Sequence, residues 1–122
     1  MIGIYTCLGA CNTGIAAAEA CIRLWKELDG EVKVSCLPAL AVPVESVVAQ
    51  QRKADKRILI DGFKEKCGAK FIAQAGMPVD RIIEITSALG IEKGKGLPTP
   101  ELEETIYEYL KKEITELLGH GE

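Results

Sequence analysis

The chain has little of what a nucleic-acid-binding or membrane protein needs. Only 5% of its 122 residues are aromatic, one is a histidine, and acidic residues outnumber lysine and arginine by 18 to 15. The resulting net charge of −3 gives no general attraction to nucleic acid or an anionic membrane, so we expect neither partner. No apolar run is long enough to span a bilayer. The N-terminus lacks a basic leader, so we expect no signal peptide and a cytoplasmic protein.

Enough apolar residues are present to build one folded core. Hydrophobic residues make up 48% and charged residues 27% of the chain, a balance typical of globular proteins. We found no internal repeat, and the length suits one domain over residues 1–122. Five cysteines are an odd number, which disfavours a disulfide framework in a chain that can form a core without one.

Apolar runs and helical patterns alternate along the sequence. This alternation predicts an α/β fold, a three-layer Rossmann-like sandwich with helices on both faces of a four-stranded parallel sheet. We expect the strand order 2-1-3-4, which places a ligand crevice at the carboxyl ends of the first and third strands. Strands are predicted at 1–6, 31–36, 56–61 and 80–85, a loop at 37–41, and helices at 15–28, 44–51, 64–75 and about 99–118.

The first predicted helix has apolar residues at helical spacing, and we expect them to form its buried face. Asn12 or Thr13 is the expected cap of its first turn. The last helix is expected to begin at the Thr99-Pro100 pair, because threonine caps helices and proline is favoured at the first helical position. The expected face of the first helix consists of Ile15, Ala18, Ile22, Trp25 and Leu28.

Four of the five cysteines fall near the carboxyl edge of the predicted sheet. Cys7 ends the first strand, Cys11 lies in the turn after it, Cys36 ends the second strand, and Cys67 begins the helix after the third strand. If the strands are neighbours, these thiols converge. Cys21 lies in the middle of a helix, where we expect it to fill the core.

Three roles for the four cysteines remain open from spacing alone. They are inert packing, metal binding, or thiol redox chemistry with Cys7 as nucleophile and Cys11 or Cys67 as resolving thiol. A structural zinc ion needs about four nitrogen or sulfur ligands. The one histidine, His120, lies in a Gly-His-Gly tail, so we expect a zinc site here to be mostly sulfur. A metal-binding protein is our first hypothesis and a thiol-transfer enzyme the alternative.

Three separated segments resemble the DGC domain family in order along the chain, over roughly residues 2–96. The family is described as zinc-binding, is named for a central Asp-Gly-Cys, and carries four candidate chelating cysteines. Cys7, Cys36 and Cys67 match three of them by position. The matching segments are Cys7-Leu8-Gly9-Ala10 with Asn12-Thr13-Gly14, then Cys36, then Ile60-Asp61-Gly62-Phe63 with Cys67-Gly68-Ala69-Lys70.

The chain departs from this family at the residue that gives it its name. Phe63 stands where the family has the central cysteine, and phenylalanine cannot bind a metal ion. Cys11 is a candidate replacement. The resemblance therefore implies a zinc site made of Cys7, Cys11, Cys36 and Cys67, or a weakened site if Cys11 does not contribute.

The turn from Gly9 to Gly14 also resembles the phosphate-binding loop of low-molecular-weight tyrosine phosphatases. Those enzymes need an arginine at the end of the loop to grip the phosphoryl oxygens, and here Thr13-Gly14 occupies that place. Phosphatase chemistry is therefore not expected. A small anion at this turn remains a candidate ligand, because helix N-termini attract negative charge.

Overall fold

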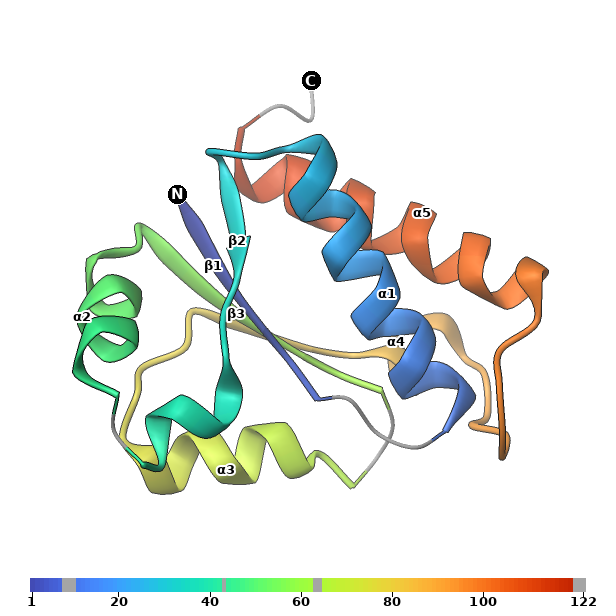
Figure 1. Ribbon diagram of the computed structural model, residues 1–122. Helices are drawn as coiled ribbons and strands as arrows, with labels where there is room; N and C mark the ends of the chain where they lie inside the picture. Colours follow the sequence, from blue (N-terminus) through green and yellow to red (C-terminus); the bar gives the residue numbers. More distant parts are fainter. Residues whose placement is uncertain (8–10, 43, 63–64, 120–122) are drawn as a thin grey trace.

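The sheet has the predicted class and strand order. The computed structural model describes residues 1–7, 11–42, 44–62 and 65–119. Its four strands pair in parallel in the order β2-β1-β3-β4 (Figure 1), so an α/β sheet of order 2-1-3-4 is confirmed. The strands are β1 (Ile2–Thr6), β2 (Val32–Val34), β3 (Lys56–Asp61) and β4 (Arg81–Glu84).

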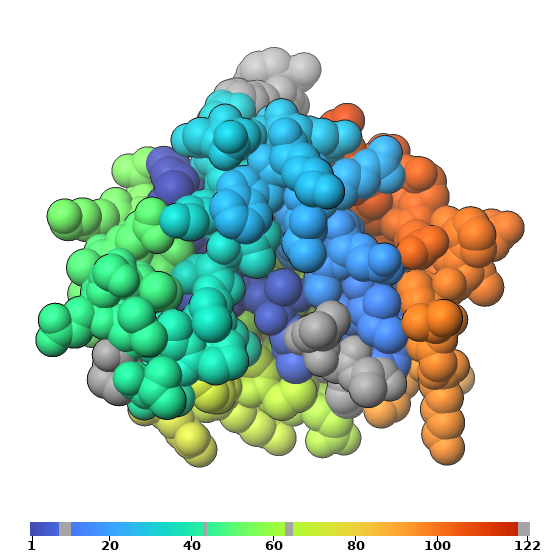
Figure 2. Space-filling view, viewed as in Figure 1, coloured from blue at the N-terminus to red at the C-terminus, as the bar shows by residue number. Residues whose placement is uncertain are grey.

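Helices cover both faces of the sheet, as the alternating pattern predicted. The first layer consists of α1 (Asn12–Glu27), α4 (Ile85–Leu89) and α5 (Pro100–Leu117). The second layer consists of the 3₁₀ helix η1 (Leu37–Leu40), α2 (Glu45–Lys53) and α3 (Cys67–Ala75). In Figure 2, α1 lies in the middle of the view, with α5 on one side and η1 and α2 on the other. No helix of the described residues is both long and apolar enough to cross a membrane.

The first layer packs on the sheet through a large apolar core. Ile106, Leu110 and Ile114 of α5 are fully buried there, beside Ile4 of β1 and Ile58 of β3. Cys21 is also fully buried in this core, which confirms its predicted packing role. The Thr99 hydroxyl caps α5 by accepting from the Leu102 amide, as predicted.

The predicted buried face of α1 was wrong in part. Ile22 is 46% exposed, whereas Ala16, Ala17 and Ala20 are buried. The helix packs against both the sheet and α5, so it buries a wide face, and the small alanine side chains allow close approach. The face predicted from helical spacing therefore included Ile22, which is exposed, and left out alanines that are buried.

The second layer has a smaller apolar core and a polar part. Tyr5, Leu59 and Ile72 are among the buried residues of the apolar cluster. Beside it, Gln51 of α2 is fully buried, and neither its amide nitrogen nor its amide oxygen has a hydrogen-bond partner among the residues that the structure describes. Gly3 of β1 leaves the space for this side chain, because a Cβ there would lie 2.0 Å from the Gln51 Oε1 atom.

Several element ends differ from the prediction for local reasons. β2 ends at Val34 and a 3₁₀ helix replaces the expected loop over 37–41. The fourth strand ends at Glu84, whose carboxylate accepts from the Ser87 amide and the Thr86 hydroxyl and so starts the short helix α4. The helix expected from residue 64 begins at Cys67, after Lys66 in a left-handed conformation (φ 53°).

Candidate functional site

The carboxyl ends of β1 and β3 bring two cysteines into contact. Cys7 follows the last residue of β1, and its amide donates to the Ile60 carbonyl of β3 at 3.3 Å. Cys67 is the first residue of α3. The two sulfur atoms lie 3.4 Å apart, although 60 positions separate the residues in sequence. The predicted convergence at this edge is therefore observed for these two thiols, which we call the thiol pair.

A carboxylate at the end of β3 fixes the start of α3, and with it the position of Cys67. Asp61 is 1% exposed and accepts from the amides of Gly68 and Ala69 at 3.1 and 3.2 Å. These amides belong to the first turn of a helix, where they have no partner inside the helix. Asp61 therefore caps the start of α3, and each of its two carboxylate oxygens accepts one of these amides.

Two glycines allow the close approach of the segments that form this edge. A Cβ on Gly68 would lie 2.5 Å from the Asp61 Oδ1 atom, so a larger residue would disturb the cap. A Cβ on Gly62 would lie 2.6 Å from the Cα atom of Gly14. Gly62 therefore lets the end of β3 approach the start of α1 directly, and both glycines serve the geometry of the site.

The environment of Cys7 favours its protonated thiol form. Partial burial, the contact with Cys67, and the negative charges of Asp61 and Cys11 together raise the pKa of Cys7 to about 12. Burial also raises the pKa of Asp61 above its usual range, although its two amide hydrogen bonds oppose the change. At neutral pH Cys7 is therefore a thiol, and thiols are poor nucleophiles compared with thiolates.

Cys11 lies near the thiol pair without joining it. It is 6% exposed at the cap position of α1, and its sulfur lies 3.6 Å from the Thr13 hydroxyl oxygen. Its charge contributes to the raised pKa of Cys7, the smallest of the contributions. The predicted cap, Asn12 or Thr13, was wrong by position, because Cys11 takes the cap position and both residues lie within the first turn of α1. The Asn12 side-chain oxygen accepts from the amides of Thr13 and Gly94. The Gly94 bond fastens the start of α1 to the loop before α5, which sequence spacing did not reveal.

The other predicted ligand, Cys36, is exposed at the cap position of η1, two residues past the end of β2. Within the described parts of the chain, no three cysteine, histidine, aspartate or glutamate side chains are grouped closely enough to hold a metal ion. The set of Cys7, Cys11, Cys36 and Cys67 thus stays a prediction, of which the structure brings two members together. Phe63, His120 and the Gly9 end of the anion-binding turn lie outside the described residues.

The thiol pair fits the donor chemistry of a thiophilic ion. Thiolate sulfur is a common zinc ligand, with zinc–sulfur bonds of about 2.3 Å, and a structural site needs about four ligands. At tetrahedral angles, bonds of that length place two sulfurs about 3.8 Å apart. The observed 3.4 Å separation is close to this value, so the pair supplies two of the four ligands with little adjustment.

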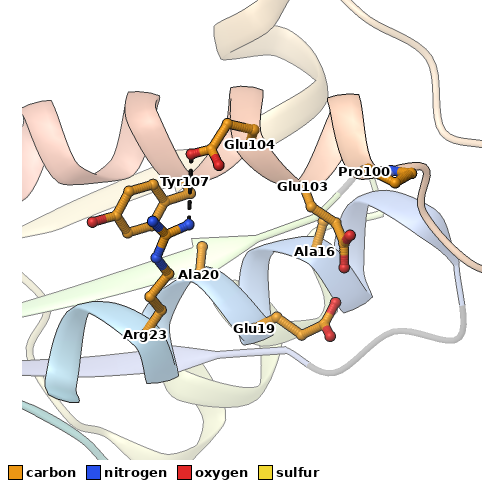
Figure 3. A pocket seen from close by; sticks show the side chains of 8 residues that line it. All are labelled: Ala16, Glu19, Ala20, Arg23, Pro100, Glu103, Glu104 and Tyr107. Carbon is orange, nitrogen blue, oxygen red and sulfur yellow. Dashed lines mark ion pairs between the residues drawn. The ribbon is translucent and has the colours of Figure 1, made fainter. Parts of the chain in front are cut away.

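A groove between α1 and α5 has a volume of about 310 Å³. Figure 3 shows the ion pair of Arg23 with Glu104 across this groove. Arg23 lies over the ring of Tyr107, 3.5 Å from the ring centre, and forms an ion pair with Glu104 at 3.5 Å. Tyr107 in turn donates to Glu27. These contacts join α1 and α5.

The fold and the paired thiols at the carboxyl edge define the chain as an α/β protein with a dithiol site. The family model of the DGC domain matches residues 3–114, and the chain therefore belongs to the DGC domain family. Comparisons with curated proteins and with solved structures found no match.

Proposed function

We propose that this protein binds a thiophilic metal ion, zinc foremost, through cysteine thiolates at the carboxyl edge of its sheet. The observation that supports the proposal is the 3.4 Å contact between the sulfur atoms of Cys7 and Cys67. Each sulfur is held by a regular element, one at the end of β1 and one at the start of α3. A pair fixed in this way binds an ion at a lower entropic cost than two free side chains.

Cys11 and Cys36 are the proposed partners of the thiol pair. Cys11 is close enough to Cys7 to contribute to its raised pKa, and Cys36 is exposed and follows β2, the neighbour of β1. Asp61 is a poor candidate ligand because both carboxylate oxygens accept helix amides. If Cys11 or Cys36 does not bind, water would complete the coordination, as it does in open zinc sites.

Metal binding agrees better with the electrostatics than nucleophilic catalysis by Cys7. With a pKa raised to about 12, Cys7 carries almost no thiolate at neutral pH, and an attacking thiol needs thiolate. A bound cation removes this obstacle, because its positive charge favours deprotonation of the thiols that bind it. The raised pKa therefore disfavours the alternative of a thiol-transfer enzyme that uses Cys7 as nucleophile.

The metal content of the purified protein tests this proposal. We expect about one equivalent of zinc per chain after purification without chelator, measured by mass spectrometry of the metal. Cys7→Ser and Cys67→Ser should each lower it at least tenfold. Cys21→Ala is the matched control, since Cys21 is fully buried in the core of the first layer, and it should keep the full content.

Two further variants assign the remaining ligands. Cys11→Ser and Cys36→Ser should each weaken binding if the residue is a ligand, and leave it unchanged if water takes that position. Less than about 0.1 equivalent of any metal in the wild-type protein, with all thiols free, would refute the proposal. Full zinc content in Cys67→Ser would refute the role of the thiol pair.

A further inference from the structure

The thiol pair differs from every other cysteine in the described part of the chain. Cys21 is fully buried in the apolar core, Cys11 is 6% exposed and contacts the Thr13 hydroxyl, and Cys36 is exposed without a thiol neighbour. Only Cys7 and Cys67 lie sulfur to sulfur, at 3.4 Å. A disulfide bond is about 2.05 Å long, so these two sulfurs need to approach by little more than 1 Å to form one.

The pair is also accessible to a small oxidant from one side. Cys67 is exposed and Cys7 is partly buried, so a molecule arriving from solvent meets the Cys67 sulfur first. The Cys7 sulfur lies beside it, in the position of a resolving thiol. The thiol pair therefore has one sulfur that an oxidant can reach and a second sulfur next to it, and both conditions favour formation of a disulfide.

We propose that the thiol pair is an oxidant-sensitive switch, in which a hydroperoxide converts Cys7 and Cys67 to a disulfide and so releases the metal ion. The proposal rests on the metal site proposed above for its consequence, although the disulfide itself requires only the two thiols. Once joined, the sulfurs no longer carry the negative charge that a thiolate ligand supplies. The site would lose both members of its pair in one event.

The chemistry proceeds in two steps. The Cys67 thiolate attacks one oxygen of hydrogen peroxide and the oxygen–oxygen bond breaks, which gives Cys67 sulfenic acid and hydroxide. The Cys7 sulfur, 3.4 Å away, then attacks the Cys67 sulfur; the Cys7 proton passes to the departing oxygen, the sulfur–oxygen bond breaks, and water leaves. In total the two thiols lose two electrons and two protons, and one peroxide becomes two waters. When the thiolates hold a divalent cation, the two protons come from solvent and the cation leaves hydrated.

The first arm of the test uses the full-length protein without metal. The reduced protein is treated with hydrogen peroxide and digested without reductant, and the peptides are mapped by mass spectrometry. We expect a Cys7–Cys67 cross-linked peptide as the main product, with Cys21 unmodified, and reversal by dithiothreitol. Cys21→Ala, a change in the core of the first layer, should form the cross-link at a rate within about twofold of the wild type, and Cys67→Ser should not form it. Products that leave Cys7 and Cys67 unlinked would overturn the inference.

The second arm uses the zinc-loaded protein and a chromogenic chelator. We expect one zinc ion to be released for each Cys7–Cys67 disulfide formed, with the same time course. A disulfide that forms while the ion stays bound would overturn the switch. The two arms separate the possible failures: a wild-type protein that forms the disulfide but never binds metal contradicts the proposed function, whereas one that binds metal but forms no such disulfide contradicts this inference alone.

Discussion

The two helical layers are attached to the same sheet by different interactions. The first layer packs through fully buried Ile106, Leu110 and Ile114 of α5 and a set of alanines in α1. The second layer has a smaller apolar cluster and depends on polar anchors. Asp61 caps α3, and the Arg57 guanidinium donates to the Gln51 carbonyl at the end of α2.

This difference matters because the thiol pair bridges the sheet and the second layer. Cys7 belongs to the end of β1 and Cys67 to the start of α3. Their contact therefore depends on how α3 is fixed, and the Asp61 cap is what fixes it. Apolar packing in the first layer stabilises the fold, whereas a hydrogen-bonded carboxylate positions the site.

The largest effect on stability is expected from the first layer. Leu110→Ala removes a fully buried side chain and should lower the free energy of unfolding by about 2–5 kcal/mol, measured by urea titration. Leu97→Ala is the control, because Leu97 is 83% exposed and its loss should cost less than about 0.5 kcal/mol. Equal effects of the two variants would contradict the assignment of the core.

A smaller effect on stability, with a specific effect on the site, is expected from Asp61→Ala. The change leaves the Gly68 and Ala69 amides without their acceptor and should cost about 1–3 kcal/mol. Amide hydrogen exchange should accelerate in α3 more than in α5, and peroxide should form the Cys7–Cys67 disulfide more slowly.

Asp61→Asn provides the matched comparison for that variant. Asparagine keeps one side-chain acceptor, so the loss of stability and the acceleration of exchange should be smaller than in Asp61→Ala. If exchange in α3 is unchanged in both variants, the cap does not position Cys67.

The smallest effect, and one of opposite sign, is expected at Gln51. Its buried amide has no hydrogen-bond partner in the described part of the chain, and an apolar side chain of similar size removes the cost of burying those polar atoms. Gln51→Leu should therefore be neutral or raise the free energy of unfolding by up to about 1 kcal/mol, measured by thermal and urea unfolding. A loss greater than about 1 kcal/mol would contradict the view that this amide weakens the second layer.

The sequence predicted the sheet well because burial of parallel strands leaves a strong pattern. The continuous apolar run Ile58-Leu59-Ile60 is typical of a strand buried on both faces, and β3 includes it. The residues of η1 were predicted as a loop, and the first residue of α4, Ile85, was predicted as the end of a strand. The start of α4 depends on a local cap, the carboxylate of Glu84. The face of α1 was misjudged because the helix packs on two partners, which its own periodicity does not reveal.

The candidate site was predictable at the level of the sheet edge and not at the level of individual contacts. Strand order placed Cys7 and Cys67 together because β1 and β3 are neighbours. The same argument placed Cys11 and Cys36 at this edge too, although neither joins the thiol pair. Strand order does not determine in which direction a side chain in a turn or after a strand end points. The resemblance, expected over residues 2–96, is matched by a family model over 3–114, which includes most of α5.

X-ray absorption at the zinc edge of the zinc-loaded protein tests the central claim most directly, because it reports the atoms bound to the ion. We predict at least two sulfur ligands at about 2.3 Å, and loss of sulfur scattering in Cys67→Ser loaded with the same amount of zinc. A spectrum of the wild-type protein that contains only oxygen and nitrogen ligands would contradict a thiolate site at Cys7 and Cys67.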